Sequence, residues 1–236
     1  MCKNIAIIPA RGGSKRIPKK NIKAFCGKPI ISYSIQAAIN SNIFDEVMVS
    51  TDSEEIANIA MTYGARVPFY RSEETSDDFA TTSDVLLEVL NGYERMGKTY
   101  KYAFCIYPTA PFLTTDLILE AEALMKAKQP DEVVTVVEFS YPPQRSYIIT
   151  EEGTLKYKYT EYINSRSQDL EKWYHDVGQL YVYNVENFRK NKGSIKGKVM
   201  PIIVSPLVAQ DIDTENDWIL AEEKYKLMNK IGGGVS

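Results

Sequence analysis

Strand-like and helix-like segments alternate through the front half of this 236-residue chain, and the alternation limits the folds it can adopt. Segment 4–9 is nearly continuous in Ile and Ala, which is typical of a strand buried on both faces of a sheet. Further strands are expected at 46–50, 66–70, 102–107 and 132–137, and helices at 29–40, 54–64, 82–96 and 115–128. This order predicts right-handed crossovers and a Rossmann-like α/β fold whose mostly parallel sheet is flanked by helices. Ligands bind such sheets at the carboxyl ends of the strands.

Local signals mark several helix starts. Pro29 stands where a first helical residue would stand. Asp52, with Glu55 three residues later, resembles a capping box, and this role keeps Asp52 out of the predicted site. Thr214 and Asp217 form the same pattern ahead of the last helix.

From Glu138 onward the chain becomes polar, rich in tyrosine and only weakly periodic. It contains too many aromatic and β-forming residues to be disordered. Residues 138–177 are therefore expected to form a small β-rich insertion that projects from a single domain spanning 1–230. The insertion would either cover a site or contact a second subunit. The remaining expected elements are strands at 178–184 and 200–204, a helix at 215–228 and a disordered tail at 231–236.

The composition is that of an ordinary globular protein, with 44% hydrophobic and 25% charged residues. A net charge of -3 does not favour nucleic acid as a partner. The three cysteines lack CxxC or metal-type spacing, which disfavours a disulfide scaffold or a zinc site and suits a reducing cytoplasm. The apolar run at 5–10 is too short for a signal peptide or a membrane span.

A glycine-containing basic loop, ARGGSKRIPKKN at 10–21, follows the first strand directly. Glycines let backbone N–H groups approach phosphate oxygens, and the lysines and arginines would neutralise them. The loop has neither the GxxxxGK[ST] pattern nor the third glycine of GxGxxG. Its residues alone are compatible with an anion-binding loop or with a solvated basic turn.

The pattern Ala10-Arg11-x-Gly13-Ser14-Lys15-x-x-x-x-Lys20-Asn21 resembles the signature of the CMP-sialic acid synthetase (acylneuraminate cytidylyltransferase) family. The likeness continues in the family's order through VMVSTDSEEIA, RSEETSDDFATTSDVLLEVL, YPTAPF and QDIDTENDW. CIYPTAPF, NSRSQDL and YHDVGQLY resemble the bacterial branch that makes CMP-pseudaminic acid. The resemblance implies a fold of the nucleotide-diphospho-sugar transferase type, a homodimer and a cytoplasmic location.

The reaction implied by the resemblance converts CTP and a 2-keto sugar acid into the CMP-sugar and pyrophosphate. The anomeric hydroxyl attacks the α-phosphorus in line, so the protein mainly positions the reactants and neutralises charge. By the family motif, Arg11, Ser14 and Lys20 would hold the triphosphate, and Arg11 and Lys20 would also stabilise the leaving charge. The other loop residues expected at the nucleotide are Gly13, Asn21 and, ranked behind them, Lys15.

A second cluster is Asp211-Ile212-Asp213. Residues two apart in an extended segment point to the same side, so both carboxylates could meet one ion. Taken alone, they could equally be surface acids ahead of the Thr214 cap. The resemblance favours Mg²⁺ binding by both, with Asp211 taking part in catalysis and the number of ions left open.

Three more residues occupy positions where the family binds the nucleotide. Arg71 would contact the base or the phosphates, unless it is a surface arginine beside Glu73 and Glu74. Thr81 and Thr82 lie where hydroxyl or backbone groups would read cytosine. An ordinary helix N-cap is the alternative for these threonines, and it is compatible with ligand contact.

The candidates for the sugar lie elsewhere in the chain. Many sialic acid synthetases carry glutamine where Tyr107 stands, which disfavours N-acetylneuraminate as the substrate. His175, Asp176 and Gln179 fall near the family's sugar-binding segment, although a lone histidine is more often structural. Arg166 would pair with the substrate carboxylate or cross a dimer interface.

The combined prediction is an enzyme that transfers CMP from CTP to the anomeric hydroxyl of a nonulosonic acid, with pseudaminic acid as the preferred substrate. Legionaminate and N-acetylneuraminate are the alternative acceptors, whereas the Gly13-Ser14-Lys15 signature disfavours 3-deoxy-octulosonate. A non-catalytic nucleotide-binding regulatory subunit on the same fold is the alternative of a different class. A downstream glycan, for example on flagellin, is implied by the resemblance alone.

Overall fold

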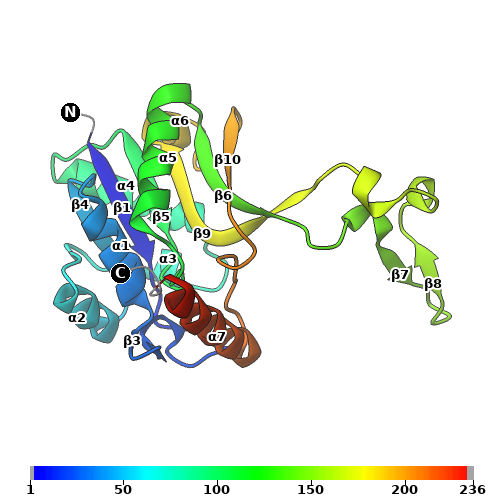
Figure 1. Ribbon diagram of the computed structural model, residues 1–236. Helices are drawn as coiled ribbons and strands as arrows, with labels where there is room; N and C mark the ends of the chain where they lie inside the picture. The colour runs from blue at the N-terminus through cyan, green and yellow to red at the C-terminus, as the bar shows by residue number, and fades with distance from the viewer. Residues whose placement is uncertain (1–2, 233–236) are drawn as a thin grey trace.

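A central six-stranded sheet organises the computed structural model, which describes residues 3–232 (Figure 1). Its strands are β1 (Asn4–Pro9), β4 (Glu46–Ser50), β5 (Tyr102–Ile106), β6 (Glu132–Glu138), β9 (Tyr174–Asn184) and β10 (Val199–Ile203). Their order is β10-β6-β9-β5-β1-β4. β1 pairs in parallel with β4 and β5, β10 pairs in parallel with β6, and β9 runs antiparallel between β5 and β6. The predicted α/β fold with a mostly parallel sheet is confirmed.

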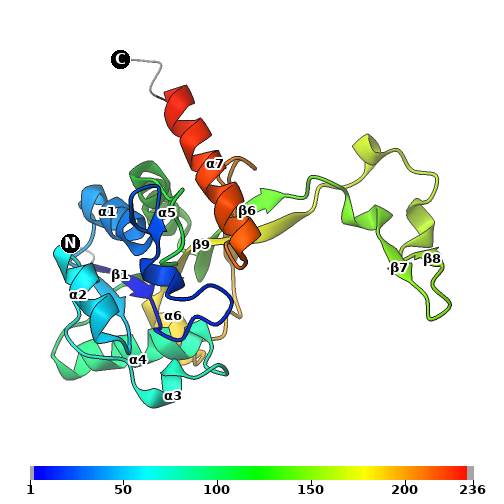
Figure 2. The same ribbon diagram turned by 90° about the horizontal axis from the view of Figure 1, so that it is seen from below.

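Side chains of β1 alternate between two cores. Ile5 and Ile7 are fully buried on one face, and Ala6 and Ile8 on the other. The helices flanking the sheet are α1 (Ile31–Ser41), α2 (Glu54–Thr62), α4 (Thr82–Arg95), α5 (Thr115–Lys128) and α6 (Val185–Lys190). Figure 2 shows α1 and α5 on the opposite side of β1 from α4 and α6. Burial of the sheet on both faces explains why the inner strands β1 and β5 are almost entirely apolar.

A third apolar cluster lies below the sheet edge and joins distant parts of the chain. It packs α7 (Glu215–Gly232) against a small hairpin formed by β2 (Ala24–Phe25) and β3 (Lys28–Pro29). The rings of Phe25 and Trp218 meet edge to face, with centroids 5.7 Å apart. This cluster brings the segment before α7 close to the basic loop.

Several predicted boundaries need correction. Pro29 belongs to β3, and α1 begins two residues later, because the hairpin precedes the helix. Ser53, not Asp52, caps α2: its hydroxyl accepts the N–H of Ile56. The expected strand at 66–70 is reduced to one isolated bridge between Met48 and Arg66.

The termini and the last helix follow the prediction in part. The predicted capping box of α7 is present, because Thr214 and Asp217 each accept the other's backbone N–H. α7 continues through Gly232, so residues 231–232 are helical and do not belong to a disordered tail; the rest of the predicted tail, residues 233–236, lies outside the described residues. α6 was not predicted. None of the helices formed by residues 3–232 combines the length and the apolar character needed to cross a bilayer.

The predicted insertion is a long arm that projects from the ends of β6 and β9 (Figure 1). Its base is the paired residues Glu138 and Tyr174, so the arm comprises 139–173. It carries a hairpin of β7 (Tyr147–Ile149) and β8 (Leu155–Tyr157), and the 3-10 helices η2 (Pro143–Arg145), η3 (Thr160–Tyr162) and η4 (Ser167–Asp169). The β-rich character of the insertion is confirmed.

Candidate active site

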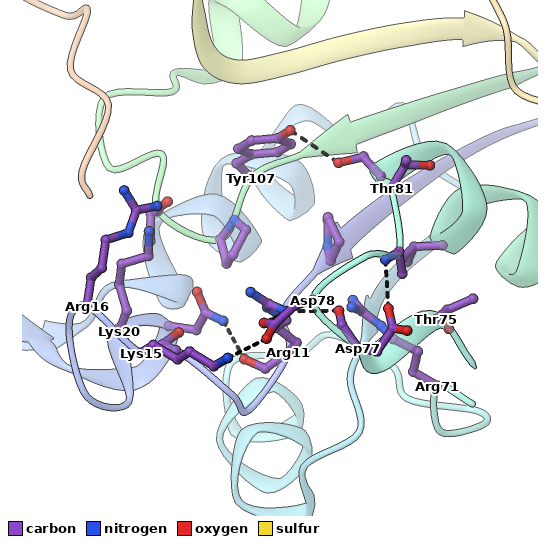
Figure 3. Close-up of a pocket in the computed structure, with 18 of the residues that line it drawn as sticks. Arg11, Lys15, Arg16, Lys20, Arg71, Thr75, Asp77, Asp78, Thr81 and Tyr107 are labelled. Carbon is purple, nitrogen blue, oxygen red and sulfur yellow. Dashed lines mark hydrogen bonds and ion pairs between the residues drawn. The ribbon is translucent and has the colours of Figure 1, made fainter. Parts of the chain in front are cut away.

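A pocket of about 490 Å³ lies at the carboxyl ends of β1 and β5 (Figure 3). Pro9 ends β1 and Tyr107 follows β5, and both residues line it. The basic loop forms one wall, and the turn at 77–82 before α4 forms another. Asp213 completes the rim from the segment ahead of α7. This is the sheet edge at which the topology predicts a ligand.

Five cationic side chains line the pocket: Arg11, Lys15, Arg16, Lys20 and Arg71. Four come from the basic loop, as predicted from its charge. Ser14 and Asn21 also line the pocket. Asn21 is buried, and its side-chain amide donates to the carbonyl oxygen of Arg11 at 2.9 Å. It therefore braces the loop from within, in addition to facing the pocket.

The path of the loop depends on Gly12 more than on Gly13. The N–H of Gly12 donates to Oδ1 of Asp52 at 2.8 Å. A Cβ at Gly12 would lie 3.2 Å from Cβ of Ser53, a tight contact. A Cβ at Gly13 would meet nothing within 4 Å, and Gly13 is not among the pocket-lining residues. The nucleotide-binding role predicted for Gly13 stays a prediction, and the glycine that the packing requires is Gly12.

Acidic side chains pair with the cations of the loop. Nη1 of Arg11 lies 2.9 Å from Oδ1 of Asp78, and Lys15 pairs with the other oxygen of the same carboxylate. Arg16 and Lys20 pair with Asp213 at 2.9 and 3.4 Å. The hydrogen bonds from Lys15 and Arg11 lower the pKa of Asp78. Positive charge is thus concentrated in the pocket, and the carboxylates of Asp78 and Asp213 partly neutralise it.

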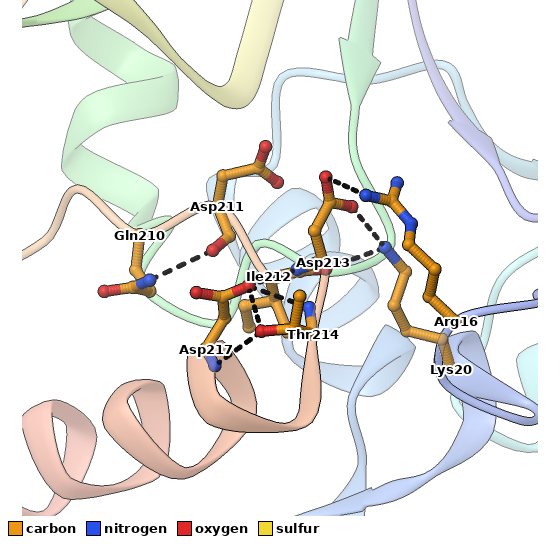
Figure 4. Close-up of polar contacts among 8 residues, drawn as sticks. All are labelled: Arg16, Lys20, Gln210, Asp211, Ile212, Asp213, Thr214 and Asp217. Carbon is orange, nitrogen blue, oxygen red and sulfur yellow. Dashed lines mark hydrogen bonds and ion pairs between the residues drawn. The ribbon is translucent and has the colours of Figure 1, made fainter. Parts of the chain in front are cut away.

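Asp211 and Asp213 flank the buried Ile212, which anchors the segment in the third apolar cluster. Figure 4 shows both carboxylates on the same side of the segment, as the spacing predicts. Desolvation raises the pKa of Asp211, and the neighbouring carboxylate of Asp213 raises it further. Two carboxylates on one side of an extended segment are hard oxygen donors suited to a hard cation. Within residues 3–232, no group of three or more potential metal ligands comes together.

Arg71, Thr81 and Thr82 all line the pocket. Arg71 is half-buried and donates to the backbone oxygen of Ser50 at 2.7 Å, and burial lowers its pKa. The alternative of a surface arginine does not hold. Thr81 is the N-cap of α4 and shares a capping box with Asp84, so the cap and the pocket contact occur together.

Tyr107 stands at the inner end of the pocket and belongs to a chain of polar contacts (Figure 3). Its hydroxyl lies 3.3 Å from Oγ1 of Thr82, and its ring lies 5.4 Å from the ring of Tyr181. The hydroxyl of Tyr181 donates to Asp176, which also accepts the N–H of Gly178. Burial raises the pKa of Tyr107, so its hydroxyl stays neutral and can donate.

The other sugar candidates do not line this pocket. Gln179 is buried and its amide donates to the carbonyl oxygen of Val208, which ties β9 to the segment before Asp211. His175 packs against Phe139 at the base of the arm, with ring centroids 4.7 Å apart. Arg166 is exposed at the start of η4 on the arm. Their predicted roles at the sugar stay predictions.

Comparison with known proteins identifies the family. The cytidylyltransferase family model matches residues 5–191. The chain is a member of the cytidylyltransferase family. It is 40% identical over 225 residues to a pseudaminic acid cytidylyltransferase of Campylobacter jejuni, covering 95% of this chain and 97% of that one. It is 32% identical to a CMP-N,N'-diacetyllegionaminic acid synthase of Legionella pneumophila, covering 94% and 96% of the two chains.

Solved structures place this cytidylyltransferase in a wider fold group. A CMP:2-keto-3-deoxy-manno-octonic acid synthetase complexed with CTP superposes with a TM-score of 0.66 over 97% of this chain and 99% of that chain. A 4-diphosphocytidyl-2C-methyl-D-erythritol synthase from Anaerococcus prevotii superposes with a TM-score of 0.65, covering 95% of this chain and 99% of that chain. Sequence identities of 16% and 15% limit these likenesses to the fold. The predicted family and fold type of the cytidylyltransferase are confirmed.

Three residues of the site were missed by sequence reasoning. Asp52 holds the loop at Gly12, and Asp77 and Asp78 line the pocket. Asp52 was assigned to a helix cap, because its position directly before a helix fits both roles. The acidic pair at 77–78 has no local signal, since its importance arises from contact with a loop more than 60 positions earlier.

Proposed function

We propose that this chain transfers CMP from CTP to the anomeric hydroxyl of a nonulosonic acid, with pseudaminic acid as its preferred acceptor. The observation that carries the proposal is the meeting of Lys20 with Asp213 across the pocket, which joins the basic loop to the acidic segment. The 40% identity to a pseudaminic acid cytidylyltransferase over nearly the whole chain supports the choice of acceptor.

The nucleotide half of the site follows from charge and shape. Arg11, Ser14 and Lys20 face the pocket from the loop and would bind the triphosphate. Thr81 and Thr82 stand at the start of α4, where the positive end of the helix dipole can attract the cytosine oxygen or a phosphate. Displacement of pyrophosphate leaves negative charge, which Arg11 and Lys20 would stabilise.

The acidic half of the site would hold Mg²⁺. Asp211 and Asp213 are hard oxygen ligands on one side of an extended segment, next to cations that would bind the triphosphate. A bound Mg²⁺ would polarise phosphate oxygens and lower the pKa of the attacking hydroxyl. Arg16 and Lys20, which pair with Asp213, would then be free to turn toward phosphate oxygens.

The acceptor would enter beside Tyr107. A Cβ built at Gly178 would lie 3.8 Å from Oδ1 of Asp211 and 3.9 Å from the ring of Tyr107, so these three groups border one small region. Tyr107 offers a neutral hydroxyl and an apolar ring face, which suit a sugar that carries both hydroxyl and deoxy or methyl positions. Asp176 contacts the edge of this region through the N–H of Gly178 and the hydroxyl of Tyr181.

We also propose that the arm at 139–173 forms a homodimer interface. Its hairpin exposes Ile149 and Leu155 by 75% and 67%, and Tyr141, ahead of η2, is 86% exposed. Apolar side chains gathered on a projecting arm favour contact with another protein surface. In such a dimer, Arg166 would reach the partner's site or the interface, whereas in this chain it lies on the arm away from the pocket.

Pyrophosphate release from CTP and Mg²⁺ with a panel of nonulosonic acids tests the main proposal. We expect turnover with pseudaminic acid and much less with legionaminic or N-acetylneuraminic acid. Release only with N-acetylneuraminic acid would overturn the choice of acceptor. CTP binding without turnover on any acceptor would instead favour the non-catalytic regulatory subunit. A cytoplasmic location fits a CTP-dependent reaction and the free thiols of Cys26 and Cys105.

A further inference from the structure

The anion-binding groups of the basic loop already hold an anion of the same chain. Nη1 of Arg11 lies 2.9 Å from Oδ1 of Asp78, and Nζ of Lys15 contacts Oδ2. Arg11 also donates to the carbonyl oxygen of Asp77 at 2.9 Å. Both acids line the pocket that the triphosphate would occupy. One carboxylate thus bridges two cations in the manner of a phosphate group.

The turn that carries Asp78 is built to present it. α3 (Glu73–Ser76) is followed by its C-cap, Asp77, whose carboxylate accepts the N–H groups of Phe79 and Ala80 at 2.9 and 2.7 Å. This local turn uses the Asp77 side chain within the loop itself and leaves Asp78 free to reach across the pocket. The contacts between the turn and the basic loop are therefore concentrated at Asp78 and the Asp77 carbonyl.

A triphosphate and the Asp78 carboxylate cannot share these cations without strong repulsion. A phosphate oxygen bound to Arg11 and Lys15 would lie within a few ångströms of the carboxylate, where like charges repel. The two ion pairs are exposed, with 38% and 76% of the two cationic side chains accessible, so they are individually weak. A ligand with several negative charges would replace a single carboxylate.

We propose that Asp78 is an affinity-determining residue that occupies the phosphate-binding position of the basic loop and must be displaced when the triphosphate binds. The inference rests on the proposed function. Ligand binding is then weakened by the fraction of molecules in which Asp78 holds Arg11 and Lys15. Displacement moves the turn at 77–80 away from the loop, or re-forms it over the bound nucleotide.

Phe79 supports a turn with a second position. It follows Asp78 directly and is 91% exposed, although aromatic side chains are usually at least half covered. A rearrangement of the turn would let this exposed ring gain apolar contact. The same turn therefore carries the Asp78 carboxylate, which must leave the phosphate-binding position, and the Phe79 ring, which would gain apolar contact if the turn moved.

Calorimetric titration of CTP and of inorganic pyrophosphate into wild type and Asp78→Asn tests the proposal. We expect Asp78→Asn to bind both ligands about threefold to tenfold more tightly, the range expected for losing two exposed competing ion pairs. Glu55→Gln is the matched control: it removes the same charge, and its partner Lys19 does not line the pocket. Glu55→Gln should bind CTP and pyrophosphate with the affinities of wild type. Thermal melting of each variant checks that it is folded.

Equal or weaker binding of both ligands by Asp78→Asn would overturn the inference, while CTP binding by wild type would still support the proposed function. Tighter binding of pyrophosphate with no binding of CTP would uphold Asp78 as the competitor and contradict the proposed function. As an independent measurement, Phe79→Trp places a fluorophore on the turn. Its emission should change on saturation with pyrophosphate, after subtraction of the wild-type signal. Constant emission would contradict displacement of the turn.

Discussion

Nζ of Lys20 lies 3.4 Å from Oδ1 of Asp213, although 193 residues separate them in the chain. The same ammonium group donates to the carbonyl oxygen of Ile212 at 2.7 Å. The segment that carries the proposed Mg²⁺ ligands is therefore tied to the loop that would hold the triphosphate. A catalyst of nucleotidyl transfer needs these groups together, because the ion and the cations neutralise the same phosphates.

Replacement of Lys20 tests this arrangement. We expect Lys20→Met to lower kcat/KM for CTP on the order of 10²–10³-fold, as for loss of one group that stabilises transition-state charge. Lys19→Met is the control, since Lys19 pairs with Glu55 and does not line the pocket. Pyrophosphate release at saturating acceptor provides the measurement. A Lys20 variant as active as the Lys19 variant would remove Lys20 from the proposed mechanism.

Asp211→Ala should abolish turnover while the protein stays folded. The substitution removes one of the two proposed carboxylate ligands, so Asp213 alone would remain to bind Mg²⁺. Thermal melting with and without Mg²⁺ provides a readout apart from activity: Mg²⁺ should raise the melting temperature of wild type but not of the variant. Asp116→Asn, in the first turn of α5 and away from the pocket, should behave as wild type. Wild-type rates in Asp211→Ala would rule out metal ligation there.

Alanine substitutions at the two adjacent glycines of the basic loop should differ in their effect on stability. Gly12→Ala places a Cβ 3.2 Å from Cβ of Ser53 and displaces the loop, so we expect a loss of stability of about 1–3 kcal/mol and a raised KM for CTP. Gly13→Ala meets open space and should change stability by less than about 0.5 kcal/mol. Urea unfolding measures both. Equal destabilisation by the two substitutions would show that the approach to Ser53 does not determine the loop path.

The capping box of α4 should make stability depend on pH. Thr81 donates its hydroxyl and N–H to Asp84, and these hydrogen bonds lower the pKa of Asp84. A depressed folded-state pKa stabilises the fold above the ordinary pKa of about 3.9, and this stabilisation is lost as the pH falls through the folded value. Asp84→Ala should therefore lower the unfolding free energy by about 0.5–2 kcal/mol at pH 7.

The difference between wild type and Asp84→Ala should shrink at pH values below the usual pKa of aspartate. Urea unfolding at neutral and acidic pH gives the comparison. Asp116→Ala, in the first turn of α5, is the control, because the cap of that helix is Thr114 accepting the N–H of Leu117. A pH-independent difference for Asp84→Ala would contradict the charged capping box.

The arm provides a prediction about assembly. Ile149 and Leu155 are paired across the β7–β8 hairpin and are largely exposed. If they form the dimer interface, Ile149→Glu should convert a dimer into a monomer in sedimentation analysis, because a charge would be buried against the partner. Glu151→Gln at the same hairpin should leave the dimer intact. A wild-type monomer would contradict the proposed interface and favour an arm that covers the site.

Local patterns predicted much of the fold. α5 runs from Thr115 to Lys128 as expected, with Thr114 as its cap, because capping and apolar spacing act over a few residues. Pro29 misled the prediction, since proline is favoured at a helix start but also suits the short hairpin that precedes α1. The strand expected near Arg66 has the right composition but too few pairing partners to extend beyond one bridge.

The sequence by itself determined the alternation of strands and helices, the basic loop and the pair of acids at 211 and 213. Each of these depends on neighbours along the chain, where side-chain period and charge can be read directly. Only the tertiary structure decided which groups meet: Lys20 with Asp213, Asp52 with Gly12, and Asp78 with Arg11. Those contacts depend on strand order and on the paths of the connecting loops. Residues far apart in sequence carry no local sign that they will share a pocket.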